Sequence, residues 1–128
     1  MEKKIYYHDT DAGGVVYYAN YLKYLEEART EFLESKGLDL ALLRDRAFFY
    51  AVNKCSIVYR APARYGDTIK VDTLLKEVTA VRMLFDQKVY DQKTQKLLVE
   101  AEVSLVCLDK NFKPTPIPED LKEKMLAS

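Results

Sequence analysis

Apolar side chains recur at spacings of three and four residues between about residues 18 and 36, and charged side chains such as Lys23 and Glu27 fall between them. This spacing is typical of an amphipathic helix, because side chains three or four positions apart share one face. Gly37 is well placed to end the helix. The pattern therefore predicts a helix of about five turns with one buried face. That face consists of Tyr21, Leu22, Leu25, Ala28, Phe32 and Leu33.

From residue 48 onward the period changes to two. Alternating apolar and polar side chains predict half-buried strands, because successive side chains of a strand point to opposite faces of the sheet. The segments between these strands, such as residues 62–67, are short enough for antiparallel turns. The long strands are predicted at about residues 48–61, 69–75, 81–89 and 97–107. One face of the first long strand carries Ala51, Cys55, Ile57, Tyr59 and Ala61.

A β-prone stretch at residues 3–8 precedes the helix, and the four long strands follow it. This order indicates an α+β fold in which a five-stranded antiparallel sheet wraps around one long helix. Asp39 is a candidate cap for a short second helix. Pro118 can open a last helix with Leu121 and Met125 facing inward. Because sheet edges leave backbone groups unpaired, we expect the sheet to pair with a second copy in a homodimer.

The chain has 128 residues, the usual size of one domain, and we expect a single domain over residues 1–128. Lysine and arginine number 20, and aspartate and glutamate also number 20. This balance provides no field to attract nucleic acid or an anionic membrane. No stretch approaches the ~18 apolar residues that a membrane span needs, and the N-terminus lacks a signal-peptide pattern. We therefore expect no membrane insertion.

Cys55 and Cys107 lie in predicted strand interiors, where buried, reduced thiols are expected, and this fits a cytoplasmic protein. One histidine and two distant cysteines cannot form a standard zinc site. No glycine-rich phosphate-binding motif occurs. We expect a reaction that needs neither a metal nor a cofactor.

Candidate catalytic groups are concentrated in the loop HDTDAGG at residues 8–14, just ahead of the predicted helix. Gly13 and Gly14 leave room for a ligand and permit positive φ. The first N–H groups of a helix lack partners, so they can stabilise a carbonyl oxygen that gains negative charge. Asp11 can then act as a nucleophile or as the general base for an attacking water. Asp9 and Asp11 can equally satisfy the turn backbone, and spacing alone leaves both interpretations open.

The stretch YYHDTDAGGVVYYANYLKYLEEART resembles, almost residue for residue, the N-terminal motif of YbgC-type acyl-CoA thioesterases. These belong to the 4-hydroxybenzoyl-CoA thioesterase group of the hot-dog superfamily. Similarity continues through VYRAPARYGD, AEVSLVCLD and KPTPIP, and so covers nearly the whole chain. The resemblance implies a hot-dog fold and hydrolysis of an acyl-CoA. It also implies an active site at the interface of a homodimer, with dimers often pairing into a tetramer.

The resemblance further implies which residues form the site. The second aspartate of the D-x-D-x-x-G motif is catalytic in this family, and that position is Asp11 here. The residue aligned with Tyr18 lies at the helix start, where a backbone N–H polarises the thioester carbonyl. Many YbgC-like members carry histidine at this position, whereas tyrosine resembles the 4-hydroxybenzoyl-CoA enzyme and is a poor base at neutral pH. Substrate contacts are expected from His8, Gly13, Gly14, Val16 and Tyr17.

Arginine forks suit phosphate, so Arg60 and Arg64, with Arg82 as a further candidate, can hold the phosphates of coenzyme A at the surface. An ordinary surface role is the alternative for each of them. The ten tyrosines similarly suit either pocket walls or core positions with one wet end.

Other polar residues near the motif have structural interpretations. Asp9 is expected to hydrogen-bond the loop, and Asn20 to bond backbone at the turn or helix start. Glu26 and Arg29 stand one helical turn apart and are expected to pair. His8 is expected to line the pocket or pack on the strand, and catalysis is the less favoured role.

Two other functions remain open from the sequence. A non-catalytic module that binds acyl-CoA or an acyl carrier is the first, although the intact Asp11 argues against it. A scaffold protein is the second, although no segment marks a docking surface. The acyl chain length, an aromatic preference and the choice between coenzyme A and an acyl-carrier protein are also left open.

Overall fold

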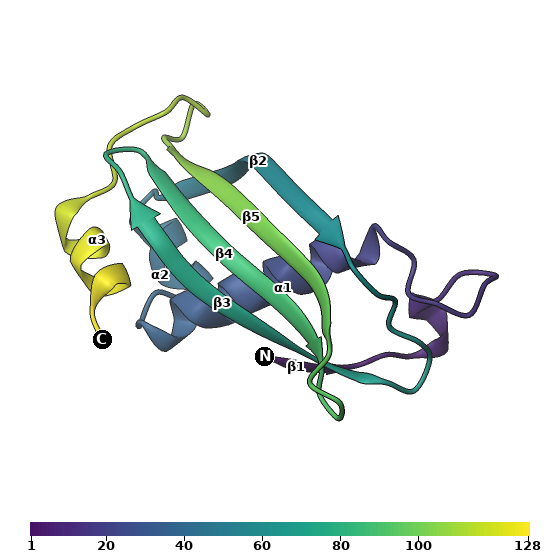
Figure 1. Ribbon diagram of the computed structural model, residues 1–128. Coiled ribbons are helices and arrows are strands. Elements are labelled where there is room, and N and C mark those ends of the chain that lie inside the picture. The colour runs from purple at the N-terminus through teal and green to yellow at the C-terminus, as the bar shows by residue number, and fades with distance from the viewer.

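An antiparallel sheet of five strands lies against one long helix in the computed structural model, which describes residues 1–128 (Figure 1). The predicted α+β class and hot-dog architecture are confirmed. The elements are β1 (Glu2–Lys4), a 3-10 turn η1 (Tyr7–Asp9), α1 (Asn20–Ser35), α2 (Leu40–Asp45), β2 (Phe49–Tyr59), β3 (Thr68–Val78), β4 (Arg82–Asp91), β5 (Leu97–Leu108) and α3 (Glu119–Leu126).

The strand order is β1-β3-β4-β5-β2, so β2 and β3 are not neighbours. The prediction that residues 62–67 form a turn between paired strands was wrong. β2 pairs with β5 at the far edge, and the connection crosses the end of the sheet beside the loop that precedes α1 (Figure 1). Its backbone finds partners there, because the Arg60 N–H donates to the Leu98 carbonyl and the Ala63 carbonyl accepts from the Val16 N–H. This crossing places the motif loop against the end of the sheet.

The predicted strand at residues 3–8 ends at Lys4, so its second half was wrong. Residues Tyr7–Asp9 form a tight 3-10 turn instead. The Tyr6 N–H, which a strand would have paired with a neighbouring strand, donates to Asp9 Oδ2 at 2.9 Å. A local side-chain acceptor has therefore replaced the sheet partner.

Helix α1 buries most of the predicted stripe against the sheet, including Leu25, Ala28 and Leu33. Leu22 is an exception, because 48% of it is exposed. Tyr24 and Arg29 are buried in addition to the predicted residues.

The predicted pair of Glu26 and Arg29 does not form. Arg29 Nη1 instead donates to Gln87 Oε1 of β4 at 3.0 Å, while Gln87 Nε2 donates to the Leu25 carbonyl at 2.9 Å. Burial lowers the pKa of Arg29, and the negative charge of Glu26 partly offsets this shift without a hydrogen bond between the two side chains. The arginine therefore ties the helix to the sheet.

Strand β2 lies at the edge of the sheet, and two predictions about its side chains were wrong. Cys55 is exposed, while Cys107 is buried as predicted. A bulge between Val52 and Lys54 also reverses the alternation, so that Ala51 stands opposite Val106 and lies on the other face from Cys55. The inner face of β2 thus presents apolar side chains that stay partly exposed, among them Val52 and Tyr59.

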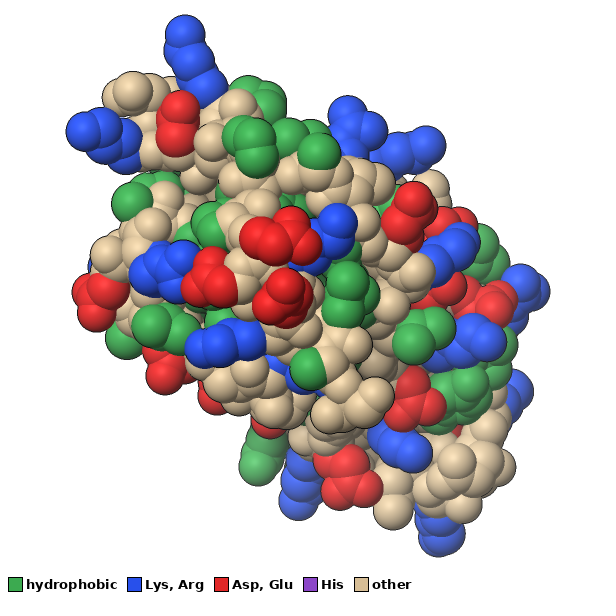
Figure 2. All heavy atoms as spheres, turned by 90° about the vertical axis from the view of Figure 1, so that its left-hand side faces the viewer, with side chains coloured by type: hydrophobic (Ala, Val, Ile, Leu, Met, Phe, Trp, Pro, Cys, Tyr) green, Lys and Arg blue, Asp and Glu red, His purple; other side chains and the backbone are tan.

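The predictions for the end of α1 and for the helices α2 and α3 are confirmed. Asp39 caps α2 by accepting from the Leu42 N–H at 2.8 Å, and Gly37 takes a left-handed φ of 79° after α1. Leu121 and Met125 of α3 face inward. Figure 2 faces this end and shows basic and acidic side chains intermixed, in line with the balanced charge. None of the helices combines the length and apolar character needed to cross a bilayer.

Candidate active site

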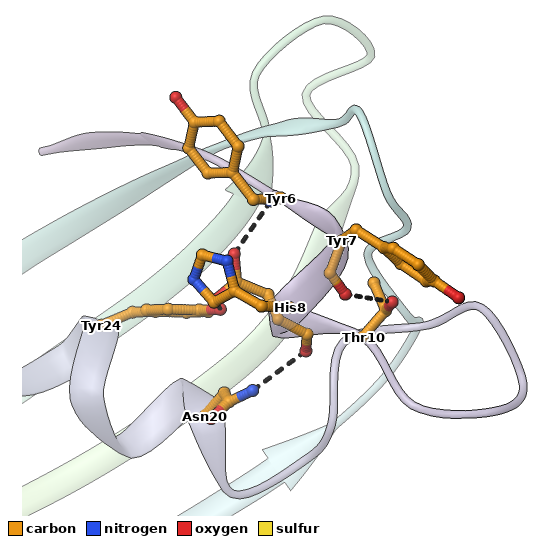
Figure 3. A network of polar contacts seen from close by, with 7 residues as sticks. Tyr6, Tyr7, His8, Thr10, Asn20 and Tyr24 are labelled. Carbon is orange, nitrogen blue, oxygen red and sulfur yellow. Dashed lines mark hydrogen bonds and ion pairs between the residues drawn. The ribbon is translucent and has the colours of Figure 1, made fainter.

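Asp9 is the centre of a hydrogen-bond network that fixes the motif loop to α1, and Figure 3 shows its partners Tyr6, Asn20 and Tyr24. Its carboxylate accepts from the Tyr6 N–H at 2.9 Å and from the Tyr24 hydroxyl at 2.7 Å. Its carbonyl oxygen accepts from Asn20 Nδ2 at 2.9 Å and from the Tyr17 N–H at 3.0 Å. The predicted structural roles of Asp9 and Asn20 are consistent with these contacts.

The environment of Asp9 favours its ionised form. Burial alone would raise the pKa of Asp9, but the hydrogen bonds from Tyr24 and Tyr6 and the charges of His8 and Lys3 hold this pKa below its usual value. The pKa of Tyr24 is raised, by burial and by the hydrogen bond to Asp9. Asp9 is therefore a buried anion with both oxygens already bonded to donors.

Asp11 lies two residues further on and is exposed. Its Oδ1 accepts from the Gly13 N–H at 2.8 Å, and its carbonyl accepts from the Gly14 N–H at 3.0 Å. Gly14 adopts a φ of 78°, which favours glycine. Asp11 Oδ2 has no hydrogen-bond partner in the chain. The turn therefore fixes one carboxylate oxygen and leaves the other available.

Helix α1 begins without a side-chain cap and without an acidic residue in its first turn. The N–H groups of Asn20, Tyr21 and Leu22 donate to carbonyls three residues earlier. The N–H groups of Tyr18 and Ala19 donate no hydrogen bond within the chain. Two free donors therefore stand at the positive end of the helix.

Two separate hollows lie beside these groups. One has a volume of about 720 Å³ and contains His8 and Asp11, and the other has a volume of about 270 Å³ and contains Val16, Tyr18 and Arg60. The first is lined by Tyr6, Tyr7, His8, Thr10, Asp11, Ala12 and Tyr65. The second is lined by Val16, Tyr18, Tyr21, Tyr59, Arg60, Ala61 and Pro62. One chain thus brings the candidate site residues together in two groups.

Tyr7, Tyr59 and Tyr65 line these hollows, and the sequence did not single them out. Only the general abundance of tyrosine pointed to pocket walls. Of the remaining candidates, Gly13, Gly14 and Tyr17 are exposed on the loop and line neither hollow.

The candidate phosphate ligands differ in availability. Arg60 Nε lies 2.5 Å from Glu100 Oε2 on the neighbouring strand, so an acidic side chain already holds its guanidinium. The side chains of Arg64 and Arg82 are exposed and form no ion pair. Arg64 directly precedes Tyr65, which lines the first hollow, whereas Arg82 is the first residue of β4.

Comparison with known proteins identifies the family. The family model described as "Thioesterase-like superfamily" matches residues 6–125. The chain belongs to this superfamily. The YbgC acyl-CoA thioester hydrolase of Escherichia coli O6:H1 is 36% identical over 119 residues, which are 92% of this chain and 88% of that protein. The resemblance to YbgC-type enzymes and the prediction of a thioester-hydrolysing enzyme are confirmed.

Two further relatives of this thioesterase-like chain act on different substrates. The structure of a 1,4-dihydroxy-2-naphthoyl-CoA thioesterase from Synechocystis superposes with a TM-score of 0.88 at 28% identity, covering 98% of this chain and 93% of that one. An acyl-acyl carrier protein thioesterase of Arabidopsis thaliana is 29% identical over 126 residues, 98% of this chain and 66% of that protein.

Proposed function

We propose that this chain hydrolyses the thioester of an acyl-CoA and that Asp11 is the catalytic carboxylate. The observation that carries the proposal is the difference between the two aspartates of the motif. Both oxygens of Asp9 are engaged, whereas Asp11 Oδ2 is free and exposed beside a hollow. In one route Asp11 attacks the carbonyl carbon, the C–S bond breaks to release the coenzyme A thiolate, and water then hydrolyses the mixed anhydride. In the other route Asp11 removes a proton from a water that attacks the same carbon and displaces the thiolate.

The free N–H groups of Tyr18 and Ala19 are the proposed donors to the thioester carbonyl. They stand at the uncapped, positive end of α1, where negative charge on the oxygen is stabilised as the transition state forms. The phenol of Tyr18 is exposed, and a hydrogen bond with Tyr18 raises the pKa of the neighbouring Tyr17 hydroxyl. Because a phenol is a poor base at neutral pH, a side-chain role for Tyr18 is limited to donating a hydrogen bond to the substrate.

A second copy of the chain is expected to complete the site. Asp11 and Tyr18 line different hollows of one chain, and the partly exposed inner face of β2 next to Tyr18 offers an apolar surface for pairing. Burying such a face by symmetric pairing of two chains also removes the open edge of the sheet. A homodimer, or a tetramer made of two such dimers, follows from this proposal.

The relatives indicate the carrier of the acyl group but not the acyl group itself. Several relatives are named as acyl-CoA thioesterases and two as acyl-acyl carrier protein thioesterases, so coenzyme A is the favoured carrier and the protein carrier is the alternative. The proposed chemistry uses a carboxylate, backbone donors and water, and it needs no metal or cofactor. A cytoplasmic location remains a prediction from the sequence.

The test is thiol release from short, long and aromatic acyl-CoAs by the wild type, Asp11→Asn and the control Asp72→Asn, an exposed aspartate on β3. We expect Asp11→Asn to lower kcat/KM about a hundredfold to ten-thousandfold, as loss of a general base does, and Asp72→Asn to leave it unchanged. Full activity in Asp11→Asn would exclude this mechanism. Tight binding of acyl-CoA without turnover by the wild type would favour the non-catalytic binding module.

A further inference from the structure

The start of α1 receives a hydrogen bond from a distant strand. Tyr59, the last residue of β2, donates its hydroxyl to the Tyr18 carbonyl oxygen at 3.2 Å. The other donor to this oxygen is the Tyr21 N–H, at 3.4 Å. Tyr59 therefore supplies the shorter of the two hydrogen bonds that set the direction of the Tyr18 carbonyl.

The direction of this carbonyl also determines the direction of a neighbouring donor. The Tyr18 carbonyl and the Ala19 N–H belong to one planar trans peptide unit and point in opposite directions. The carbonyl points along the helix, so the Ala19 N–H points out of its open end. A hydrogen bond accepted by the carbonyl also polarises the peptide, which makes its N–H a stronger donor.

The position of Tyr59 is itself well determined. Its backbone pairs with Val99 of β5, and its ring lies 6.1 Å from the ring of Tyr18 and 5.7 Å from that of Tyr21, measured between centroids. Burial, with smaller contributions from Cys55 and Tyr18, raises the pKa of Tyr59. The hydroxyl therefore keeps its proton and remains a donor at neutral pH.

We propose that Tyr59 is a positioning residue, which orients the Tyr18–Ala19 peptide so that the Ala19 N–H joins the Tyr18 N–H in polarising the thioester carbonyl. The proposal rests on the proposed function and assigns one donor within it. The interaction that Tyr59 supports grows as the carbonyl oxygen gains charge. Its loss therefore affects kcat more than KM.

The test compares Tyr59→Phe with Tyr50→Phe in the full-length protein, on the acyl-CoA that the wild type hydrolyses best. Each change removes one hydroxyl from the inner face of β2, but the Tyr50 hydroxyl donates no hydrogen bond. We expect Tyr59→Phe to lower kcat about tenfold, less than the loss of a whole oxyanion donor, with KM nearly unchanged. Tyr50→Phe is expected to keep both constants.

A second measurement does not depend on turnover. The amide proton resonance of Ala19 in a 1H–15N spectrum is expected to move upfield in Tyr59→Phe and to stay in place in Tyr50→Phe. A wild-type kcat in Tyr59→Phe, or a raised KM with constant kcat, would overturn the proposal, as would an unmoved Ala19 resonance. Absence of all thioesterase activity in the wild type would count against the proposed function, and the Ala19 resonance would then decide the positioning role alone.

Discussion

Asp9 and Asp11 are the same residue type, two positions apart on one loop, yet their surroundings differ in every respect that matters for chemistry. Asp9 is 6% exposed and accepts hydrogen bonds at both carboxylate oxygens. Asp11 is exposed and accepts one, from the Gly13 N–H within its own turn. The buried carboxylate has no free oxygen to offer a substrate, whereas the exposed one does.

The difference indicates a division of roles along the loop. Asp9 joins the 3-10 turn to α1 through Tyr24, and its carbonyl holds Tyr17 and Asn20 at the helix start. The anchored segment then presents Asp11 on one side and the free N–H groups of α1 on the other. One aspartate thus stabilises the geometry in which we propose that the other acts.

The sharpest test of this division makes the same substitution at both positions. In Asp9→Asn the new amide group can keep both partners only if the Tyr24 hydroxyl turns from donor to acceptor, and both hydrogen bonds lose their charged acceptor. We expect the free energy of unfolding to fall by about 2–3 kcal/mol, because hydrogen bonds to a charged group contribute about 1.5–3 kcal/mol. In Asp11→Asn we expect a change within about 0.5 kcal/mol, as at other exposed sites. Urea denaturation followed by circular dichroism measures both values, and equal losses would contradict the division.

Alanine substitutions at Gly13 and Gly14 have different expected effects. One displaces the Asp11 carboxylate, and the other strains the backbone. Gly14→Ala places a side chain at a φ of 78°, and we expect it to cost about 1 kcal/mol of stability. In Gly13→Ala the new Cβ lies 3.2 Å from Asp11 Oδ1 and must displace it slightly. Stability is expected to hold while kcat falls roughly threefold to tenfold, since small misplacements of reacting groups are costly. Thermal melts and thioester kinetics on both variants check this, and an unaffected kcat in Gly13→Ala would count against Asp11.

The smallest expected effect is the pH dependence that Asp9 gives to stability. The folded-state pKa of Asp9 lies below its ordinary value, so unfolding takes up a proton in acid. The stabilisation is therefore complete above the unfolded pKa of about 4 and is lost as pH falls through the lower folded pKa. The gap in unfolding free energy between wild type and Asp9→Asn should narrow between pH 5 and pH 2, in urea titrations at each pH. A gap independent of pH would mean that folding does not lower the pKa of Asp9.

Predictions from the sequence failed where side-chain hydrogen bonds or the order of strands in the sheet overrode the hydrophobic pattern. The strand expected at residues 3–8 gave way to a 3-10 turn, because Asp9 captures the Tyr6 N–H. Arg29 was expected to pair with Glu26 one turn away, yet it bonds Gln87 on β4. Cys55 was expected to be buried and is exposed, because β2 lies at the sheet edge.

The sequence by itself determined the helices, the four long strands and the family. The hydrophobic period, the helix caps and the long motif are patterns of residues close together in sequence, so they can be recognised without the structure. Only the tertiary structure decided which motif carboxylate is saturated, which N–H groups of α1 are free and which side chain holds the helix start. The deciding hydrogen bonds join Asp9 to Tyr24 and Tyr18 to Tyr59, across 15 and 41 positions. Contacts at such separations depend on how the sheet and helix pack, and no local pattern along the chain encodes them.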